Sequence, residues 1–154
     1  MRLRIIWVGK TRNAHLRALC EEYLKRLSHF ARCEISELRD SDRGNPAAGI
    51  ERETKRISDA LREGAEVVLL DPKGAEWSSE QLADQVRRWS DQGSKEVTFI
   101  VGGPFGVSPD FATRVKTRWS LSRMTFTHEM VRVLLLEQLY RAVSILRQHP
   151  YHRD

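Results

Sequence analysis

Two segments in the last third of the chain carry the residue types best suited to chemistry. The first is the turn Gly102-Gly103-Pro104-Phe105-Gly106, which directly follows the apolar run 97–101. Glycines after a strand allow backbone conformations closed to other residues, and they let a small ligand approach the main chain closely. The alternative is a purely structural tight turn. The turn lacks both the Gly-Lys-Ser/Thr of a Walker loop and the glycine spacing of the dinucleotide fingerprint.

The second segment is the C-terminal tail His149-Pro150-Tyr151-His152-Arg153-Asp154, which follows a long apolar helical pattern. Aromatic and basic groups on an exposed tail suit base stacking and phosphate contact. The spacing of His149 and His152 also fits a metal pair, but no third ligand lies nearby, so we expect no metal. Arg141 precedes the tail, and its structural alternative is an ion pair with Glu137, four residues earlier.

The positive charge of the chain is concentrated in its last quarter. The net charge is +5. Residues 1–113 hold 18 Lys and Arg against 18 Asp and Glu, whereas residues 114–154 hold eight against three. A polyanion such as RNA is a natural partner for this segment, because neutralised phosphates release counterions. A solvated basic face is the alternative interpretation.

Bulk composition indicates one globular domain spanning residues 1–154. The chain is 40% hydrophobic and 31% charged, which excludes wholesale disorder. Cys20 and Cys33 form neither a CxxC motif nor a framework of pairs, as in reduced cytoplasmic proteins. The apolar run 5–8 is too short for a signal peptide, and no stretch approaches membrane-spanning length. We therefore expect a cytoplasmic protein without a membrane segment.

Strand-like and helix-like patterns alternate along the chain. Apolar runs predict strands at 3–8, 33–38, 66–70, 97–101 and within 119–126. Helical spacing predicts helices at 13–30, around 50–61, from 78 to 93, from 109 and at 129–148, and a loop is expected at 40–46. This alternation predicts an α/β fold with a mainly parallel sheet and helices on both faces.

Ligands of such sheets bind beyond the carboxyl ends of the strands. Three connections are candidates here: Asp71-Pro72-Lys73-Gly74, which we expect to stop the third strand, the turn 102–106, and the loop after the fifth strand.

The last helix is apolar around most of its circumference, and an edge helix cannot bury all its sides within one chain. Core burial or self-association as a two-fold dimer would explain it. His128, at its start, has capping or packing as its default role.

Taken together, four segments resemble the RlmH family of SPOUT-class methyltransferases, which act on bacterial large-subunit ribosomal RNA. The resemblance runs the full length of the chain and includes the tail. The segments are 69–71 with Gly74, 99–106, 119–128, and 131–142 continued by 150–153.

The resemblance implies an α/β fold whose C-terminal part forms a trefoil knot, within roughly residues 70–148, followed by an RNA-facing tail at 149–154. It implies a homodimer that binds S-adenosylmethionine in the knot and needs no metal. The implied reaction is methylation of N3 of pseudouridine 1915 in 23S rRNA of the assembled ribosome. The implied cofactor contacts are Leu70, Gly102, Gly103, Leu121, Ser122, Arg123, Met124, Thr125, Phe126 and Thr127.

Arg141, Tyr151 and His152 are the residues that the resemblance places toward the RNA and the reacting base. We hypothesise that His152 accepts the N3 proton, Arg141 holds a phosphate or the developing negative charge, and Tyr151 stacks on the base. Two other functions stay open. The chain would be a non-catalytic basic module that binds RNA or the ribosome, or an α/β enzyme acting on a small nucleotide.

Overall fold

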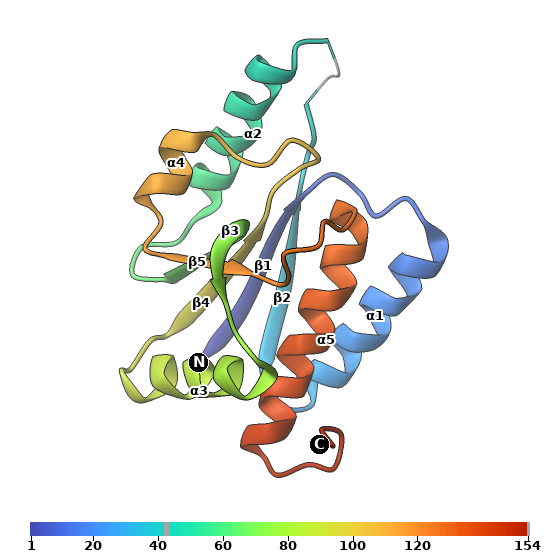
Figure 1. Cartoon of the computed structure of the whole chain (residues 1–154), viewed down its shortest axis with the longest axis vertical. Helices are drawn as coiled ribbons and strands as arrows, with labels where there is room; N and C mark the ends of the chain where they lie inside the picture. Colours follow the sequence, from blue (N-terminus) through green and yellow to red (C-terminus); the bar gives the residue numbers. More distant parts are fainter. Residues whose placement is uncertain (42–43, 154) are drawn as a thin grey trace.

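The protein folds around one five-stranded sheet in which every neighbouring pair of strands is parallel. The computed structural model describes residues 1–41 and 44–153, so the expected loop at 40–46 and the tail at 149–154 lie partly outside the described residues. The spatial order is β2-β1-β4-β3-β5 (Figure 1). The strands are β1 Arg2–Val8, β2 Arg32–Leu38, β3 Glu66–Glu76, β4 Glu96–Val101 and β5 Thr117–Ser120. The predicted parallel α/β sheet is confirmed.

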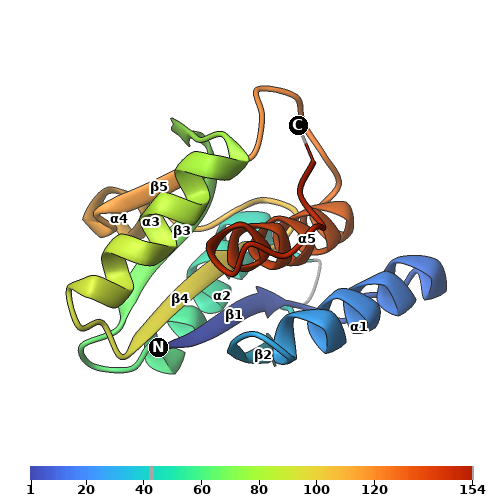
Figure 2. The same ribbon diagram turned by 90° about the horizontal axis from the view of Figure 1, so that it is seen from below.

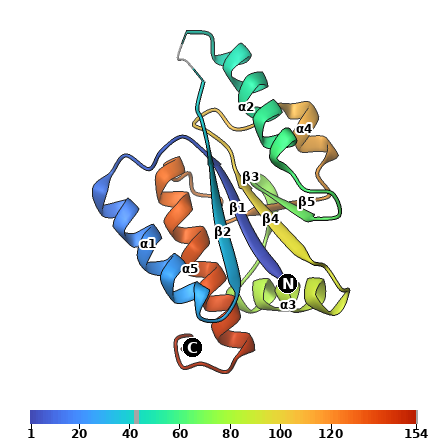
Figure 3. The ribbon, with the colours of Figure 1, turned by 180° about the vertical axis from the view of Figure 1, so that it is seen from behind.

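Helices cover both faces of the sheet, as predicted (Figures 1 and 2). One face carries α1 Ala14–Ser28, α3 Ser79–Asp91 and α5 His128–Leu146, which pack in the larger of two apolar clusters. The other face carries α2 Pro46–Ala60 and the short α4 Pro109–Arg114, on the smaller cluster (Figure 3). The central strands β1 and β4 are almost wholly buried because both of their faces are covered.

Helix starts in this chain follow the capping signals of the sequence. Ser78 precedes α3, and its hydroxyl accepts a hydrogen bond from the Gln81 backbone N–H at 3.1 Å, while the Gln81 side chain accepts one from the Ser78 N–H at 2.8 Å. These two hydrogen bonds form a capping box. Ser108 likewise caps α4, with Pro109 in the first turn.

Replacing Ser78 by Ala should lower the free energy of unfolding by about 1 kcal/mol, because the Gln81 N–H at the start of α3 loses its acceptor. Urea denaturation followed by circular dichroism measures the change. Ser90→Ala, at an exposed position of the same helix, is the control and should change the value little. A Ser78 variant as stable as Ser90→Ala would contradict the role of the box.

The last helix lies in the middle of its layer, between α1 and α3 (Figure 1). Its buried positions are Arg132, Val133, Leu135, Leu136, Leu139, Tyr140, Ala142, Val143 and Ser144. Treating α5 as an edge helix was therefore wrong, because two flanking helices and the sheet bury most of its circumference. Its apolar surface does not by itself call for a partner.

The third strand continues past the point where the sequence predicted its end. Asp71-Pro72-Lys73-Gly74 forms an irregularity inside β3, whose pairing with β5 shifts register between Leu70 and Ala75. Gly74 permits this, because a Cβ atom there would lie 2.5 Å from the Arg118 carbonyl carbon. The expected stop at Asp71 was wrong because a proline and a turn sequence are tolerated at such an irregularity. The fifth strand begins at Thr117 and ends at Ser120, so residues 121–127 form a loop.

Candidate functional site

A cavity of about 790 Å³ opens where strands β3, β4 and β5 end. This is the edge at which parallel sheets bind ligands. The walls come from three connections: the irregular part of β3, the glycine turn after β4, and the loop between β5 and α5. Its lining residues are Asn13, Leu16, Leu69, Leu70, Asp71, Pro72, Val101, Gly102, Gly103, Pro104, Gly106, Val107, Ala112, Trp119, Ser120, Leu121, Ser122, Met124, Thr125, Phe126, Thr127, His128, Glu129 and Val131.

The glycine turn is folded tightly against itself. The Gly106 N–H donates to the Gly103 carbonyl at 2.9 Å, and Gly106 has a φ of +78°, a conformation that favours glycine. A Cβ atom on Gly102 would lie 3.1 Å from the Gly106 backbone. Side chains are thus excluded from one wall of the cavity, which leaves bare main chain facing it.

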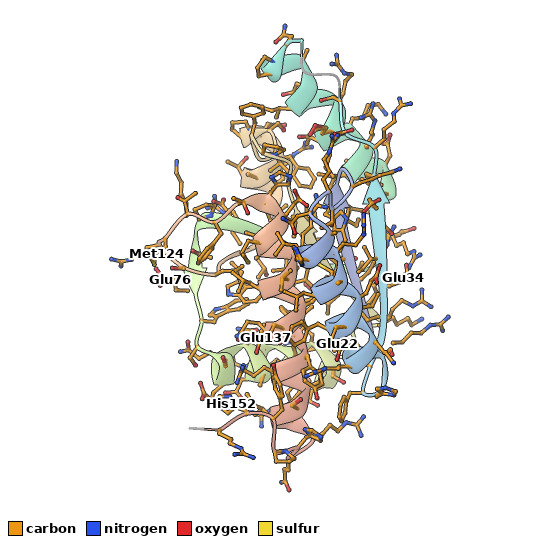
Figure 4. All side chains as sticks on the ribbon, turned by 90° about the vertical axis from the view of Figure 1, so that its right-hand side faces the viewer. Glu22, Glu34, Glu76, Met124, Glu137 and His152 are labelled. Carbon is orange, nitrogen blue, oxygen red and sulfur yellow. The ribbon has the colours of Figure 1, made fainter. Side chains whose placement is uncertain are left out.

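The loop 121–127 is held by its own serine and threonine side chains. The Ser120 hydroxyl donates to the Ser122 carbonyl at 2.9 Å, and the Ser122 hydroxyl accepts from the Met124 N–H at 3.0 Å. Thr127 caps α5 by accepting from the Met130 N–H. Met124 is 73% exposed, so its side chain extends from the loop toward solvent (Figure 4).

The structure brings nine of the ten expected cofactor residues to this one cavity. The exception is Arg123, which does not line the cavity. Its guanidinium pairs with the Glu76 carboxylate at 3.1 Å, outside the cavity, and its side chain is 91% exposed. Gly103 and Thr125, far apart in sequence, share the cavity wall.

The cavity combines apolar walls with carboxylates. Its acidic side chains are Asp71 and Glu129, and none of the described residues that line it is Lys or Arg. Glu129 accepts a hydrogen bond from the Asn13 N–H at 3.0 Å, and backbone donors of this kind hold its pKa below the ordinary value. Asp71 Oδ2 lies 3.6 Å from Arg118 Nη1, so Glu129 is the carboxylate of this lining that favours a positively charged ligand. Sequence reasoning missed Glu129, because only the fold brings the start of α5 to the sheet edge.

His128 also lines the cavity, beyond the capping or packing role expected for it. Partial burial, followed by the nearby positive charge of Arg132, lowers the pKa of His128 below 6.5. The folded protein therefore prefers the neutral imidazole. Because the unfolded chain binds the proton more readily, stability contributed by His128 is present above pH 6.5 and is lost as the pH falls through the lower folded-state pKa.

Replacing His128 by Gln should therefore flatten the decline of the melting temperature between about pH 7 and pH 5. Calorimetric melts across this range measure the slope. His15→Gln, at an exposed position of α1, is the matched control. An unchanged slope for His128→Gln would show that its imidazole titrates alike in the folded and unfolded states.

The three expected RNA-facing residues meet in a second cluster at the other end of α5. Arg141 Nη1 lies 3.3 Å from His152 Nδ1, and the guanidinium lies over the Tyr151 ring, 4.9 Å from its centre. Glu137 accepts from Arg141 Nε at 3.1 Å, as the ion-pair alternative predicted, and from the Tyr151 hydroxyl at 3.0 Å. His152 Nε2 lies 2.9 Å from Glu80 Oε1, at the start of α3. Glu137 and His152 lie together, away from Met124 (Figure 4).

This tail cluster does not reach the cavity of its own protomer. The cavity includes His128, whereas Arg141 lies 13 residues further along α5, about 20 Å at 1.5 Å per residue. None of Arg141, Tyr151 and His152 lines the cavity. The cavity and the tail cluster are therefore two separate groups of residues in one chain.

Most of the eight Lys and Arg residues in the C-terminal segment are buried or paired with carboxylates. Arg132 is fully buried, so it contributes nothing to a surface. Four more cations of this segment pair with carboxylates: Arg114 with Asp110, Arg118 with Asp71, Arg123 with Glu76 and Arg141 with Glu137. The basic surface is thus smaller than the sequence count predicted. Lys116, Arg147 and Arg153 complete the set of eight.

Residues 1–41 and 44–153 contain neither a metal-binding cluster nor a membrane-spanning helix. In this part of the chain no group of three or more His, Cys, Asp and Glu side chains has a metal-binding arrangement. Within the same residues, none of the helices has the length and apolarity that crossing a membrane requires.

Comparison with known proteins gives a consistent result over the whole chain. A family model described as "Predicted SPOUT methyltransferase" matches residues 1–152. A protein of Gloeobacter violaceus is 43% identical over 152 residues, which is 99% of each chain. One of a Geobacter species is 41% identical over 154 residues, the full length of both, and one of Desulfotalea psychrophila is 40% identical over 153 residues, covering 99% of this chain and 100% of the relative. All three relatives are named ribosomal RNA large subunit methyltransferase H.

Proposed function

The chain belongs to the SPOUT methyltransferase family, and from this premise we propose that it methylates N3 of pseudouridine 1915 in 23S rRNA, using S-adenosylmethionine. The family fold includes the trefoil knot that the resemblance implied. We assign the knot to roughly residues 70–148 and the RNA-facing tail to 149–154. The names of the full-length relatives support ribosomal RNA as the substrate. An assembled ribosome in the cytoplasm is its proposed setting.

The observation that carries the proposal is the single cavity lined by nine of the ten expected cofactor residues. Its volume of about 790 Å³ lies in the range of small-molecule sites. Bare glycine backbone at 102–103 leaves room for close ligand approach, and apolar walls such as Leu70, Leu121 and Phe126 suit a nucleoside and a thioether chain. The Glu129 carboxylate suits the net positive charge of the methyl donor, whereas Asp71 already pairs with Arg118.

When bound, S-adenosylmethionine supplies a sulfonium methyl group that is reactive without an enzyme nucleophile or a metal. The chain must orient this group toward N3 and remove the N3 proton. A new N3–carbon bond forms as the carbon–sulfur bond breaks, the electron pair passes to sulfur, and the proton passes to a base. N3 lies on the Watson–Crick edge, so the base has to be unpaired or extruded.

We propose that His152 accepts the N3 proton. The contacts of its ring indicate that Nδ1 is the nitrogen that accepts it. A guanidinium can only donate, so the Arg141 contact at 3.3 Å requires a lone pair on His152 Nδ1. Nε2 then carries the hydrogen and donates it to Glu80 at 2.9 Å. A carboxylate behind an imidazole orients the ring and stabilises its protonated form. Arg141 is placed to move from Nδ1 to the developing negative charge of the base.

The separation of cavity and tail cluster supports a homodimer as the working unit. A cavity and a tail about 20 Å apart along α5 cannot meet within one protomer, but a two-fold partner can bring its tail to the first protomer's cavity. Exposed apolar side chains near the cavity, Phe105, Met124, Phe126 and Met130, give such a partner a surface to cover.

Two measurements test the proposed function together. Calorimetry should show one molecule of S-adenosylmethionine bound per intact site, and mass mapping should find a methyl group missing from 23S rRNA of cells that lack the protein. Absence of cofactor binding would favour a non-catalytic RNA-binding module. Methylation of a free nucleoside but not of ribosomes would favour an enzyme of small nucleotides.

A further inference from the structure

The carboxylate of Glu53 contacts the glycine turn 102–106 at Gly103. Glu53 belongs to α2 and is 9% exposed. A Cβ atom on Gly103 would lie 2.7 Å from Glu53 Oε1, closer than any real Cβ contact, so the carboxylate packs directly against the turn. Glu53 Oε2 accepts from the Ser41 hydroxyl at 3.0 Å, which fixes the side chain in this position.

The next residue of α2 holds the other end of the same turn. The Thr54 hydroxyl oxygen accepts a hydrogen bond from the Ser108 N–H at 2.9 Å, and both residues are buried. Ser108 in turn caps α4 through the Phe111 N–H. Two adjacent side chains of α2 therefore contact the turn 102–106 at Gly103 and just beyond it, at Ser108. The connection after β4 runs beside α2 (Figure 1).

Burying the carboxylate of Glu53 at this position carries a cost that packing alone does not explain. A carboxylate taken out of water is unfavourable unless it meets donors or positive charge. Across the described residues, the hydrogen bond from Ser41 is the one that Glu53 accepts, and no Lys, Arg or His pairs with it within 4 Å. An apolar side chain of similar length would fill the same space without this cost. Gly103, which Glu53 contacts, also lines the cavity, so a positively charged ligand bound there would be a counterpart for this charge.

We propose that Glu53 positions the Gly102–Gly106 turn and, by its charge, makes the cavity prefer the cationic methyl donor over the neutral product. This inference rests on the proposed function. Methyl transfer converts the sulfonium of the donor into a thioether, so the ligand loses one positive charge at the moment of reaction. Glu53, which contacts Gly103 without lining the cavity, adds to the negative charge of Glu129 in the lining. A negative environment then binds S-adenosylmethionine more tightly than S-adenosylhomocysteine, which helps the product leave.

Calorimetric titration of both ligands into three variants tests this. Glu53→Gln keeps the shape and removes the charge, so affinity for S-adenosylmethionine should fall about tenfold while affinity for S-adenosylhomocysteine changes less than about twofold. Glu53→Ala removes the packing against Gly103 as well, so both affinities should fall. Glu51→Gln, at an exposed position of the same helix, should leave both within about twofold of the wild type.

The outcomes separate this inference from the function on which it rests. A wild-type protein that binds neither ligand would overturn the proposed function. If the wild type binds both and Glu53→Gln weakens them equally, or leaves both unchanged, charge selection by Glu53 is wrong. If Glu53→Ala also binds both as the wild type does, the positioning role is wrong. Melting curves of the isosteric Glu53→Gln variant show whether it folds, so a misfolded Ala variant leaves the test intact.

Discussion

Replacing His152 by Ala should lower the rate of methyl transfer to ribosomes by about 100- to 1,000-fold, because the N3 proton loses its acceptor. Affinity for S-adenosylmethionine should stay within about twofold of the wild type, because His152 lies in the tail cluster and not on the cavity wall. Single-turnover methylation with labelled cofactor measures the rate, and calorimetry measures the affinity.

The tail offers a matched control for this change. His149 is also an imidazole of the tail, but its ring packs edge-on against Phe30 at 5.4 Å between ring centres, with no part in the tail cluster described above. His149→Ala should therefore lower the methylation rate far less than His152→Ala. Equal losses of rate and cofactor affinity in His152→Ala would contradict the role of His152 as the acceptor of the N3 proton.

Replacing Arg132 by Met should lower the free energy of unfolding by about 3–5 kcal/mol, because three buried acceptors lose their donor. The buried guanidinium donates to the Val8 carbonyl at 2.7 Å, the Gly9 carbonyl at 3.0 Å and the Thr11 hydroxyl at 2.9 Å, and it lies 4.8 Å from the Trp7 ring centre. A methionine fills similar space but leaves these acceptors without donors in the interior. Although burial lowers the pKa of Arg132, the group stays charged at neutral pH.

Urea denaturation gives this value directly, with Arg147→Ala as the control. Arg147 is exposed at the end of the same helix, so its removal should cost less than about 0.5 kcal/mol. A loss for Arg132→Met as small as that of Arg147→Ala would mean that water replaces the guanidinium at the end of β1. Arg132 would then not tie α5 to the connection between β1 and α1.

Much of the fold was readable from local pattern. The strand at 97–101 and the helix starts after Ser78 and Ser108 could be predicted, because they depend on residues that are neighbours in the sequence. The continuation of β3 through Asp71–Gly74 was not readable. The residues on both sides of it, Leu70 and Ala75, pair with β5, which lies more than 40 residues later, and a proline with a turn sequence normally ends a strand.

The candidate site divides in the same way. The glycines after β4 and the loop after β5, with Ser122, Thr125 and Thr127, can be recognised in the sequence, whereas Glu129 and Glu53 look like ordinary surface acids of two helices. Only the fold places Glu129 at the cavity and Glu53 against Gly103. The eight C-terminal cations led to the opposite error, because the sequence predicted a larger basic surface than the structure has. Sequence alone does not distinguish a buried guanidinium such as Arg132 from a surface one.

Mixed dimers provide the most direct measurement of a site shared between two protomers. One protomer would carry Gly103→Val, whose side chain would collide with Glu53 and displace the turn that lines the cavity, and the other His152→Ala; each homodimer should be inactive. The mixed dimer keeps one intact cavity and one intact tail on different chains, so it should recover about half the wild-type methylation rate, from one restored site of two. Mixed dimers that stay as inactive as the parent homodimers would contradict the shared site, because cavity and tail would then have to act within a single chain.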